Sequence, residues 1–287
     1  MHKRRAEILL TLPSLVWLGA FVLVPLLIVF FIAFKPSLPQ GGIGAGWSTD
    51  AVRALAHPSY PELVWRTLWI SAVTTGLCLA FALPVAYFMA RLAPVWRARL
   101  LLLVIVPFWT NFVIRVFAWQ QILHAEGLLA DSLRALRLLG PSDSLLYNSA
   151  AVVLVSVYTY LPFAILPLFA AAEKFDFGLL DAARDLGARP LRALHSVFLP
   201  GVRQGIITAV LVVFIPMLGS YVIPDMVGGK DTQMIGNRIA QRNFNDRNIP
   251  QAAALSAALT LAVLAPMFLR RRKTTEPAGA GMKAGAA

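Results

Sequence analysis

Three residues in the last third of the chain come closest to a phosphate-binding motif. Gly228, Gly229 and Lys230 match the end of Gly-x-x-x-x-Gly-Lys-Ser/Thr, whose backbone amides and lysine hold nucleotide phosphates. The motif needs Ser or Thr after the lysine, where this chain has Asp231. It also needs a glycine five residues before Gly229, where the chain has Pro224. The sequence therefore predicts no nucleotide site, and any ATP chemistry requires a different chain.

Residues that bind metals or perform redox chemistry are sparse. Cys78 is the one cysteine, so no disulfide or Cys-x-x-Cys pair forms within the chain. The histidines stand far apart, without metal-ligand spacing such as His-Glu-x-x-His, at His2, His57, His124 and His195. No nucleophile and base stand at a recognisable spacing. We expect no metal site, and we expect that the chain is not an enzyme.

One charged side chain, Arg115, lies within an otherwise uncharged stretch, Leu100–Leu123. A charge inside a membrane span is costly and tends to face the protein interior with a partner. We predict a structural or gating pair with Asp225 near the outer mouth; the alternative is that Arg115 reaches out to the interface. Asn111 and Tyr221 are further candidates for a transport pathway, although aromatic residues also gather at membrane interfaces.

The elements that must position these residues are long apolar stretches. Hydrophobic residues make up 58% of the 287 residues, and charged residues only 14%, against about 25% in soluble domains. Six stretches are long enough to cross a hydrocarbon core of about 30 Å as helices. They are Ile8–Phe34, Thr67–Ala90, Leu100–Leu123, Ser144–Ala172, Gln204–Pro224 and Asn248–Leu269. The sequence predicts an all-α integral membrane protein with six transmembrane helices.

The basic residues predict how these helices are oriented. The net charge is +12, and its positive residues flank the apolar stretches, which indicates membrane orientation rather than nucleic-acid binding. Sixteen Lys and Arg lie on the side that holds both termini and nine on the other. We therefore expect both termini in the cytoplasm. The first stretch has 27 uncharged residues, longer than a signal peptide needs, so we expect it to be retained.

The longest cytoplasmic connection, residues 173–200, has the pattern of two short amphipathic helices. Apolar residues recur at helical spacing in the first: Leu179, Leu180, Ala183 and Leu186. Gly187 then stands where a helix-ending glycine is expected, and Pro190 suits the first turn of a new helix. The second apolar face consists of Leu191, Leu194 and Val197. Such a pair is typical of a docking element; a helix lying on the membrane surface is the alternative.

This connection resembles the EAA loop of ABC importer permeases with the type I fold. That loop reads Glu-Ala-Ala, three residues, Gly, nine residues, Ile-x-Leu-Pro. The same spacing occurs here, with Asp for Glu and Val for Ile, in Asp181, Ala182, Ala183, Gly187, Val197, Leu199 and Pro200. The resemblance implies that a coupling helix around Phe177–Leu186 fits a cleft on a separate ATPase subunit. Asp181 would face a basic group there.

A wider resemblance, from about Leu63 to Leu269, is to the spermidine/putrescine branch of these permeases. It is carried by the blocks Pro107–Arg115, Tyr158–Pro167, Tyr221–Gly229 and Met234–Asn237. The resemblance implies a binding-protein-dependent importer of spermidine, putrescine or a related small amine-bearing solute. An ion-coupled secondary transporter is the alternative. It is disfavoured because the apolar stretches contain no paired carboxylates.

The resemblance also implies an assembly in the bacterial inner membrane. Its partners would be a second permease subunit, two ATPase subunits that bind ATP and Mg²⁺, and an external solute-binding protein. This chain would bind no cofactor of its own and no nucleic acid. We expect residues 1–62 to form a cytoplasmic segment, the first membrane helix and an external loop. Residues 63–269 would form the permease core, and residues 270–287 a disordered basic tail.

Overall fold

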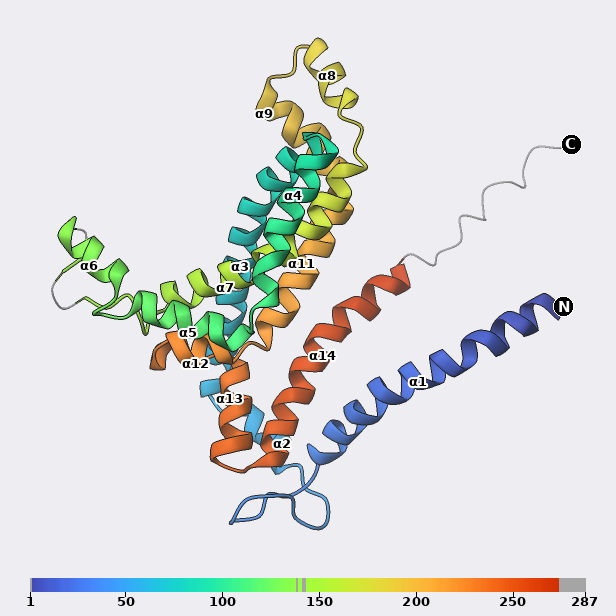
Figure 1. Ribbon diagram of the computed structural model, residues 1–287. Helices are drawn as coiled ribbons and strands as arrows, with labels where there is room; N and C mark the ends of the chain where they lie inside the picture. Colours follow the sequence, from blue (N-terminus) through green and yellow to red (C-terminus); the bar gives the residue numbers. More distant parts are fainter. Residues whose placement is uncertain (1, 138, 141–142, 274–287) are drawn as a thin grey trace, which may run out of the picture. The chain divides into compact units, whose positions relative to one another are not determined.

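The computed structural model describes residues 2–137, 139–140 and 143–273, and their regular structure is helical (Figure 1). Within these residues the one β-type contact is an isolated bridge between Ser37 and Ile43. Helices satisfy their backbone hydrogen bonds internally, as a lipid environment requires. The all-α prediction is confirmed. Most of the expected basic tail, residues 274–287, lies outside the described residues.

The helices follow one another with mostly short connections. The longer ones are α1 (His2–Ile32), α3 (Ser59–Arg91), α4 (Pro94–Ile105), α5 (Phe112–Leu123), α7 (Ser149–Glu173), α11 (Arg203–Leu218) and α14 (Ile249–Lys273). The shorter ones are α2 (Asp50–Arg53), α6 (Leu128–Ala135), α8 (Gly178–Asp185), α9 (Pro190–Ala193), α10 (Leu199–Gly201), α12 (Val222–Val227) and α13 (Ile235–Ala240). Single 3-10 or π turns are η1 (Ala54–Ala56), η2 (Val106–Trp109), η3 (Leu194–Phe198), η4 (Lys230–Thr232) and η5 (Gln241–Asn245).

Three of the described helices are long and apolar enough to cross a membrane unbroken: Thr11–Ile32 within α1, α3 and α7. Two bent helix pairs each have the length and composition of one further span, Pro94–Trp109 with Phe112–Leu123 and Pro190–Gly201 with Arg203–Leu218. The described apolar part of α14, Ile249–Ala265, is shorter. The structure thus supports three to five crossings, and the count of six remains a prediction.

The third predicted span is not one straight helix. η2 ends at Trp109, and α5 begins after an extended Thr110 and Asn111 at an angle of 90° to the preceding helix. Asn111 starts the new helix, since its side-chain oxygen accepts hydrogen bonds from the backbone N–H groups of Val113 (2.8 Å) and Ile114 (3.4 Å). Such a cap is worth about 1 kcal/mol of helix stability. Asn111, a candidate for the transport pathway, therefore also stabilises the start of α5.

The chain forms two compact units. One consists of the residues up to Pro58 together with those from Ile239 onward. In this unit α14 packs against α1 and α2 through a core of small side chains: Ala33, Ala51, Ala253 and Ala254. Between residues 11 and 32 of α1, most side chains are exposed, for example Trp17 at 68%. So large an apolar surface needs lipid or another protein to cover it.

The other unit, Ser59–Arg238, has a core of three helices, α3, α7 and α11, which lie side by side in Figure 1. Small buried side chains let the helices approach closely, among them Ala82 on α3, Ala164 on α7 and Ala209 on α11. At Gly205 on α11, an added Cβ would lie 2.5 Å from the Cβ of Ala171 on α7. This tightly packed bundle carries both loops that contain the candidate functional residues.

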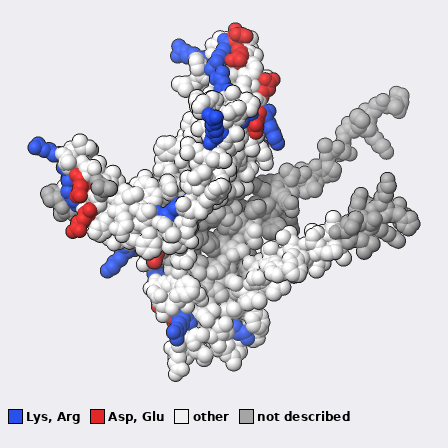
Figure 2. Space-filling view, in the orientation of Figure 1, with Lys and Arg blue, Asp and Glu red and all other residues white. Residues whose placement is uncertain are grey.

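Charged side chains gather at the ends of this second unit. On the face shown in Figure 2, Lys, Arg, Asp and Glu cover the tip formed by α8 and α9 and the region of α6. The helical surface between them is almost free of charge. The helices of this unit carry exposed apolar residues, including Phe81 and Phe88 on α3, Leu103 on α4 and Ile114 on α5. An uncharged apolar band between charged ends is the surface of a membrane protein.

Candidate functional site

The loop between α7 and α11 contains a short helix that ends in a Schellman motif. α8 spans Gly178–Asp185, and Gly187 follows it with a φ of +85°. The N–H of Gly187 donates to the carbonyl of Arg184 (2.8 Å), and the N–H of Ala188 donates to that of Ala183 (3.0 Å). These two bonds define the motif and require a left-handed residue at the position of Gly187. The chain therefore turns sharply there and leads into α9.

The acidic motif residue lies on the exposed side of α8. The carboxylate of Asp181 is 3.5 Å from the guanidinium of Arg184, and both side chains are exposed. Ala182 is exposed and Ala183 is half-buried. Leu180 is 3% exposed and anchors the helix. The predicted apolar face is therefore divided: only part of it packs on the chain itself.

Three leucines of this loop are exposed in the described part of the chain. Leu179 is 52% exposed, Leu186 is 90% exposed and Leu191 is 81% exposed. Leaving leucine in water forgoes about 1.5–3 kcal/mol relative to full burial. Exposed leucines beside acidic and basic side chains at the tip of a helix pair are typical of a surface that docks on a partner.

The second half of the motif lies where the loop returns to the bundle. Pro190 occupies the first turn of α9, which passes through the π turn η3 into α10. Val197 and Leu199 are half-buried against the core beneath the loop, and Pro200 is exposed. The segment Pro190–Gly201 then bends by 72° into Arg203–Leu218. The motif's last residues thus form the joint between the loop and α11.

The other candidate residues lie around α5 and α12. These two helices pack together, and the side-chain amide of Gln120 donates to the carbonyl of Met226 (3.1 Å). Among the described residues, no ion pair joins Arg115 to Asp225. The guanidinium of Arg115 instead lies over the ring of Phe108, 5.3 Å from its centre. The two charges share one region of the fold without pairing in this structure.

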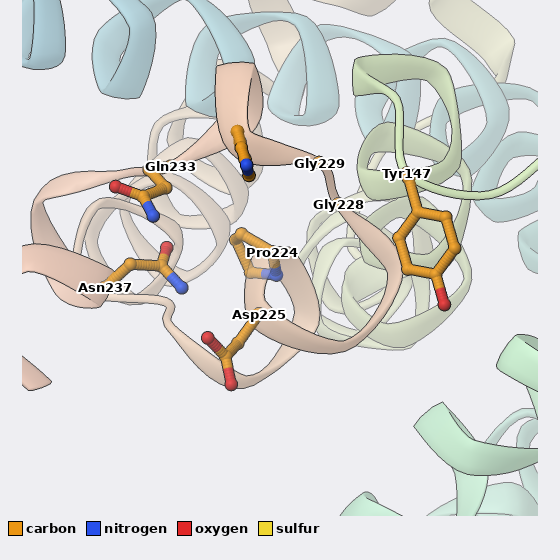
Figure 3. Close-up of a pocket in the computed structure, with 8 residues that line it drawn as sticks. Tyr147, Pro224, Asp225, Gly228, Gly229, Gln233 and Asn237 are labelled. Carbon is orange, nitrogen blue, oxygen red and sulfur yellow. The ribbon is translucent and has the colours of Figure 1, made fainter. Parts of the chain in front are cut away.

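Asp225 lines a cavity of about 390 Å³ beside α12 (Figure 3). Tyr147, Lys230, Gln233 and Asn237 line it as well. Asn237 is 8% exposed and holds the wall together: it donates to the carbonyl of Tyr221 (3.0 Å) and accepts from the N–H of Met234 (3.1 Å). Asp225 forms no ion pair with any described residue, so its charge is available to a ligand.

Several residues of this cavity were not singled out from the sequence, because its walls come from distant segments. Tyr147 precedes α7 and has a φ of +62°, and its N–H donates to the carbonyl of Val227 (2.8 Å). An added Cβ at Gly229 would collide with the carbonyl oxygen of Tyr147. The adjacent glycines at 228 and 229 were the available signal, since paired glycines mark close backbone approach.

Two features of the second unit are candidates for function. One is the exposed tip around α8 and α9, and the other is the cavity beside α12 that Asp225 lines. Among the described residues, no three His, Cys, Asp or Glu side chains come together in a group that would hold a metal ion.

A family model decides the identity. The model, described as a binding-protein-dependent transport system inner membrane component, matches residues 3–271. The chain belongs to this family of transport permeases. Its members are permeases rather than enzymes, which agrees with the prediction that the chain is not an enzyme. The multi-pass membrane location is likewise confirmed.

Individual relatives of this permease cover most of its length. It is 35% identical over 256 residues to the spermidine/putrescine transport system permease protein PotB of Haemophilus influenzae, covering 89% of this chain and 90% of that one. PotB of Escherichia coli strain K12 is 34% identical over 245 residues, with 85% and 89% covered. The inner membrane ABC transporter permease protein YdcU of the same strain is 29% identical over 286 residues, with 92% and 88% covered.

Solved structures share the permease fold. A chain of a bacterial ABC transporter involved in the import of the acidic polysaccharide alginate superposes with a TM-score of 0.67 and 16% identity, covering 96% of this chain and 98% of that one. A bacterial alginate ABC transporter in complex with a periplasmic protein that holds an alginate pentasaccharide gives 0.66 and 15%, with 96% of each chain covered. At this identity the likeness establishes the fold alone. The expected ABC permease fold is thus confirmed.

Proposed function

We propose that this permease is a subunit of an ATP-driven importer of polyamines, spermidine and putrescine above all, or of a related small amine-bearing solute. The relatives named for spermidine/putrescine transport support the substrate class, since they match most of the chain at 34–35% identity. The observation that carries the mechanism is the loop around α8. It combines the motif spacing with a Schellman turn and exposed leucines at the tip of the bundle.

In this proposal α8 is the coupling helix and fits a cleft on a separate ATPase subunit. Leu179 and Leu186 supply apolar contact area, and Asp181 exchanges its weak pairing with Arg184 for a basic group on the ATPase. Exposed pairs of this kind contribute little, about 0–1 kcal/mol, so giving one up is not costly. ATP and Mg²⁺ bind to that subunit, and this chain supplies none of the nucleotide site.

The proposed assembly contains two permease subunits, two ATPase subunits and an external solute-binding protein. The chain crosses the bacterial inner membrane six times, with α14 as the sixth span and both termini in the cytoplasm. The charge distribution supports this orientation, because sixteen Lys and Arg lie on the side of α8 and the termini. The loop beside α12 then faces the external solute-binding protein.

The cavity beside α12 is the proposed outer mouth. Protonated amines need a carboxylate or carbonyl oxygens to replace lost water, and Asp225 offers an unpaired carboxylate at this position. Arg115 lies on the neighbouring helix α5, from which it could compete with an amine for Asp225 in another state of the transport cycle. The Arg115–Asp225 pair is thus proposed for a closed state, with Asn111 and Tyr221 on the flanking segments.

Uptake in reconstituted vesicles tests this function. The permease and its partner subunits are placed in proteoliposomes with the binding protein outside, and uptake of radiolabelled spermidine and putrescine is measured with and without ATP inside. ATP-dependent uptake of either polyamine is expected. ATP-driven uptake of a different solute would support an ATP-driven importer but contradict polyamines as its substrate. Uptake that follows an ion gradient without ATP would instead make the chain a secondary transporter.

A further inference from the structure

Four aromatic rings meet beneath the coupling helix. The centre of the Phe198 ring is 5.1 Å from that of Tyr87 and 5.2 Å from that of Phe175, and both pairs are edge-to-face. Phe177 completes the set, 5.7 Å from Tyr87 and 5.4 Å from Phe175, again edge-to-face. Edge-to-face pairs are favoured over sandwiches because the positive ring edge meets the negative face. The four side chains are called the aromatic cluster below.

The cluster joins segments that must move together if α8 drives transport. Tyr87 belongs to α3, Phe175 and Phe177 lie between α7 and α8, and Phe198 ends the π turn η3. The same core includes Leu180 of α8 and Val202 at the start of α11. Every connection from the docking tip to the bundle therefore passes through or beside these rings.

The cluster is tightly held. Phe198 is 2% exposed, and an added Cβ at Gly201 would collide with the ring of Phe175. At the solvent-exposed edge of the cluster, Arg91 donates a hydrogen bond to the hydroxyl of Tyr87 (2.8 Å). The guanidinium of Arg91 lies 5.7 Å from the centre of the Phe177 ring. Packed side chains with few voids have discrete arrangements and do not deform continuously, so they transmit displacement.

We propose that the aromatic cluster is the mechanical link that converts movement of α8 into movement of α3 and α11, with its four members as positioning residues. This proposal rests on the proposed function. When the ATPase subunit displaces α8, the interlocked rings carry Tyr87 and the start of α11 with it. If the rings do not pack against one another, α8 moves but α3 and α11 do not follow it. ATP is then hydrolysed without uptake.

The test compares uptake with ATP hydrolysis in the complete complex. Phe198→Leu keeps the site apolar and removes three ring contacts, and Phe21→Leu on the exposed face of α1 is the matched control. Copurification of the ATPase, ATPase rate and polyamine uptake are measured for each. Phe198→Leu is expected to assemble and to hydrolyse ATP, and to lower uptake per ATP at least about threefold. Phe21→Leu is expected to match the wild type.

A surface variant covers the case in which Phe198→Leu does not assemble. Arg91 is exposed, so Arg91→Gln leaves the core intact while removing the cation from the rings. It is expected to lower uptake per ATP about twofold. Unchanged uptake per ATP in the assembled variants, or equal losses of uptake and ATPase rate, would overturn the link. A wild-type complex without ATP-driven uptake would overturn the proposed function and the link together.

Discussion

Gly187 illustrates how one residue can shape a docking surface without touching a partner. Its φ of +85° is open to glycine and costly for most other residues, while an added Cβ would meet no atom within 4 Å. The restriction at this position is therefore purely conformational. Asparagine tolerates the left-handed region better than branched residues do.

Exchange of Gly187 tests this interpretation. Gly187→Val is expected to cost about 1–2 kcal/mol at the turn and to reduce copurification of the ATPase with the permease. Gly187→Asn, the matched control, is expected to retain most of both copurification and uptake. The two variants have similar side-chain volumes, so equal losses in both would point to steric exclusion rather than backbone conformation.

Asp225 gives a second prediction at the residue scale. Asp225→Asn keeps the shape of the cavity and removes its negative charge, which is expected to raise the half-saturating polyamine concentration about tenfold, since a hydrogen bond to a charged group is worth about 1.5–3 kcal/mol. Asp231→Asn is the control, because Asp231 is exposed and does not line the cavity. Equal effects of the two changes on uptake would remove Asp225 from the pathway.

The sequence was informative about residues with local tasks and less so about those brought together by folding. The backbone conformations of Gly187 and Pro190 depend mainly on the residue type itself, so their places in the loop were predictable. Asn111 stood out because it is polar within an apolar stretch; the structure adds that its amide oxygen caps α5, and its place in the pathway stays a prediction. Gln233 and Tyr147 meet in one cavity from segments that no local pattern connects.

At the scale of elements, helical spacing predicted that Leu179, Leu180, Ala183 and Leu186 share one apolar face of a docking helix. The structure buries Leu180 and leaves Leu186 at 90% exposed. Helical spacing identifies which residues share a face, but it does not say whether that face meets the same chain or another one. The third predicted span shows a related limit, because hydropathy shows length and apolarity but not the 90° break at Thr110 and Asn111.

The exposed Leu186, which directly follows α8, makes the docking surface testable. Leu186→Ser is expected to weaken copurification of the ATPase about tenfold, because burying a leucine contributes at least about 1.5 kcal/mol. Thermal stability of the permease itself should not change. Leu136→Ser, at a residue 68% exposed in the loop after α6, is the matched control. Normal copurification with Leu186→Ser would place the docking surface elsewhere on the loop.

At the scale of the whole molecule, membrane topology depends on charge and apolar length, and both can be read from the sequence. Within the residues that the structure describes, unbroken or bent helices account for three to five crossings. The sixth span depends on α14, whose described apolar part ends at Ala265. The orientation of the helices in the membrane is set during insertion in the cell, so helix packing alone does not determine it.

Cysteine labelling tests the orientation. Cys78 is buried, and Cys78→Ser gives a background without cysteine. Ser196→Cys near α9 and Asn243→Cys in η5 are both exposed positions. A membrane-impermeant maleimide added to intact spheroplasts is expected to label the cysteine at 243, and the one at 196 only after permeabilisation. The reverse pattern would invert the proposed topology.

The π turn at Leu194–Phe198 has a consequence for the spacing of the motif. A π turn accommodates one more residue than an α turn, so it acts as a phase shift along the helix. Removing or adding a single residue there would rotate the helical residues beyond it by about 100°. Phe198 would then leave its three aromatic neighbours. The nine residues between Gly187 and Val197 therefore set an angle as well as a length, and the segment should tolerate substitutions far better than insertions or deletions.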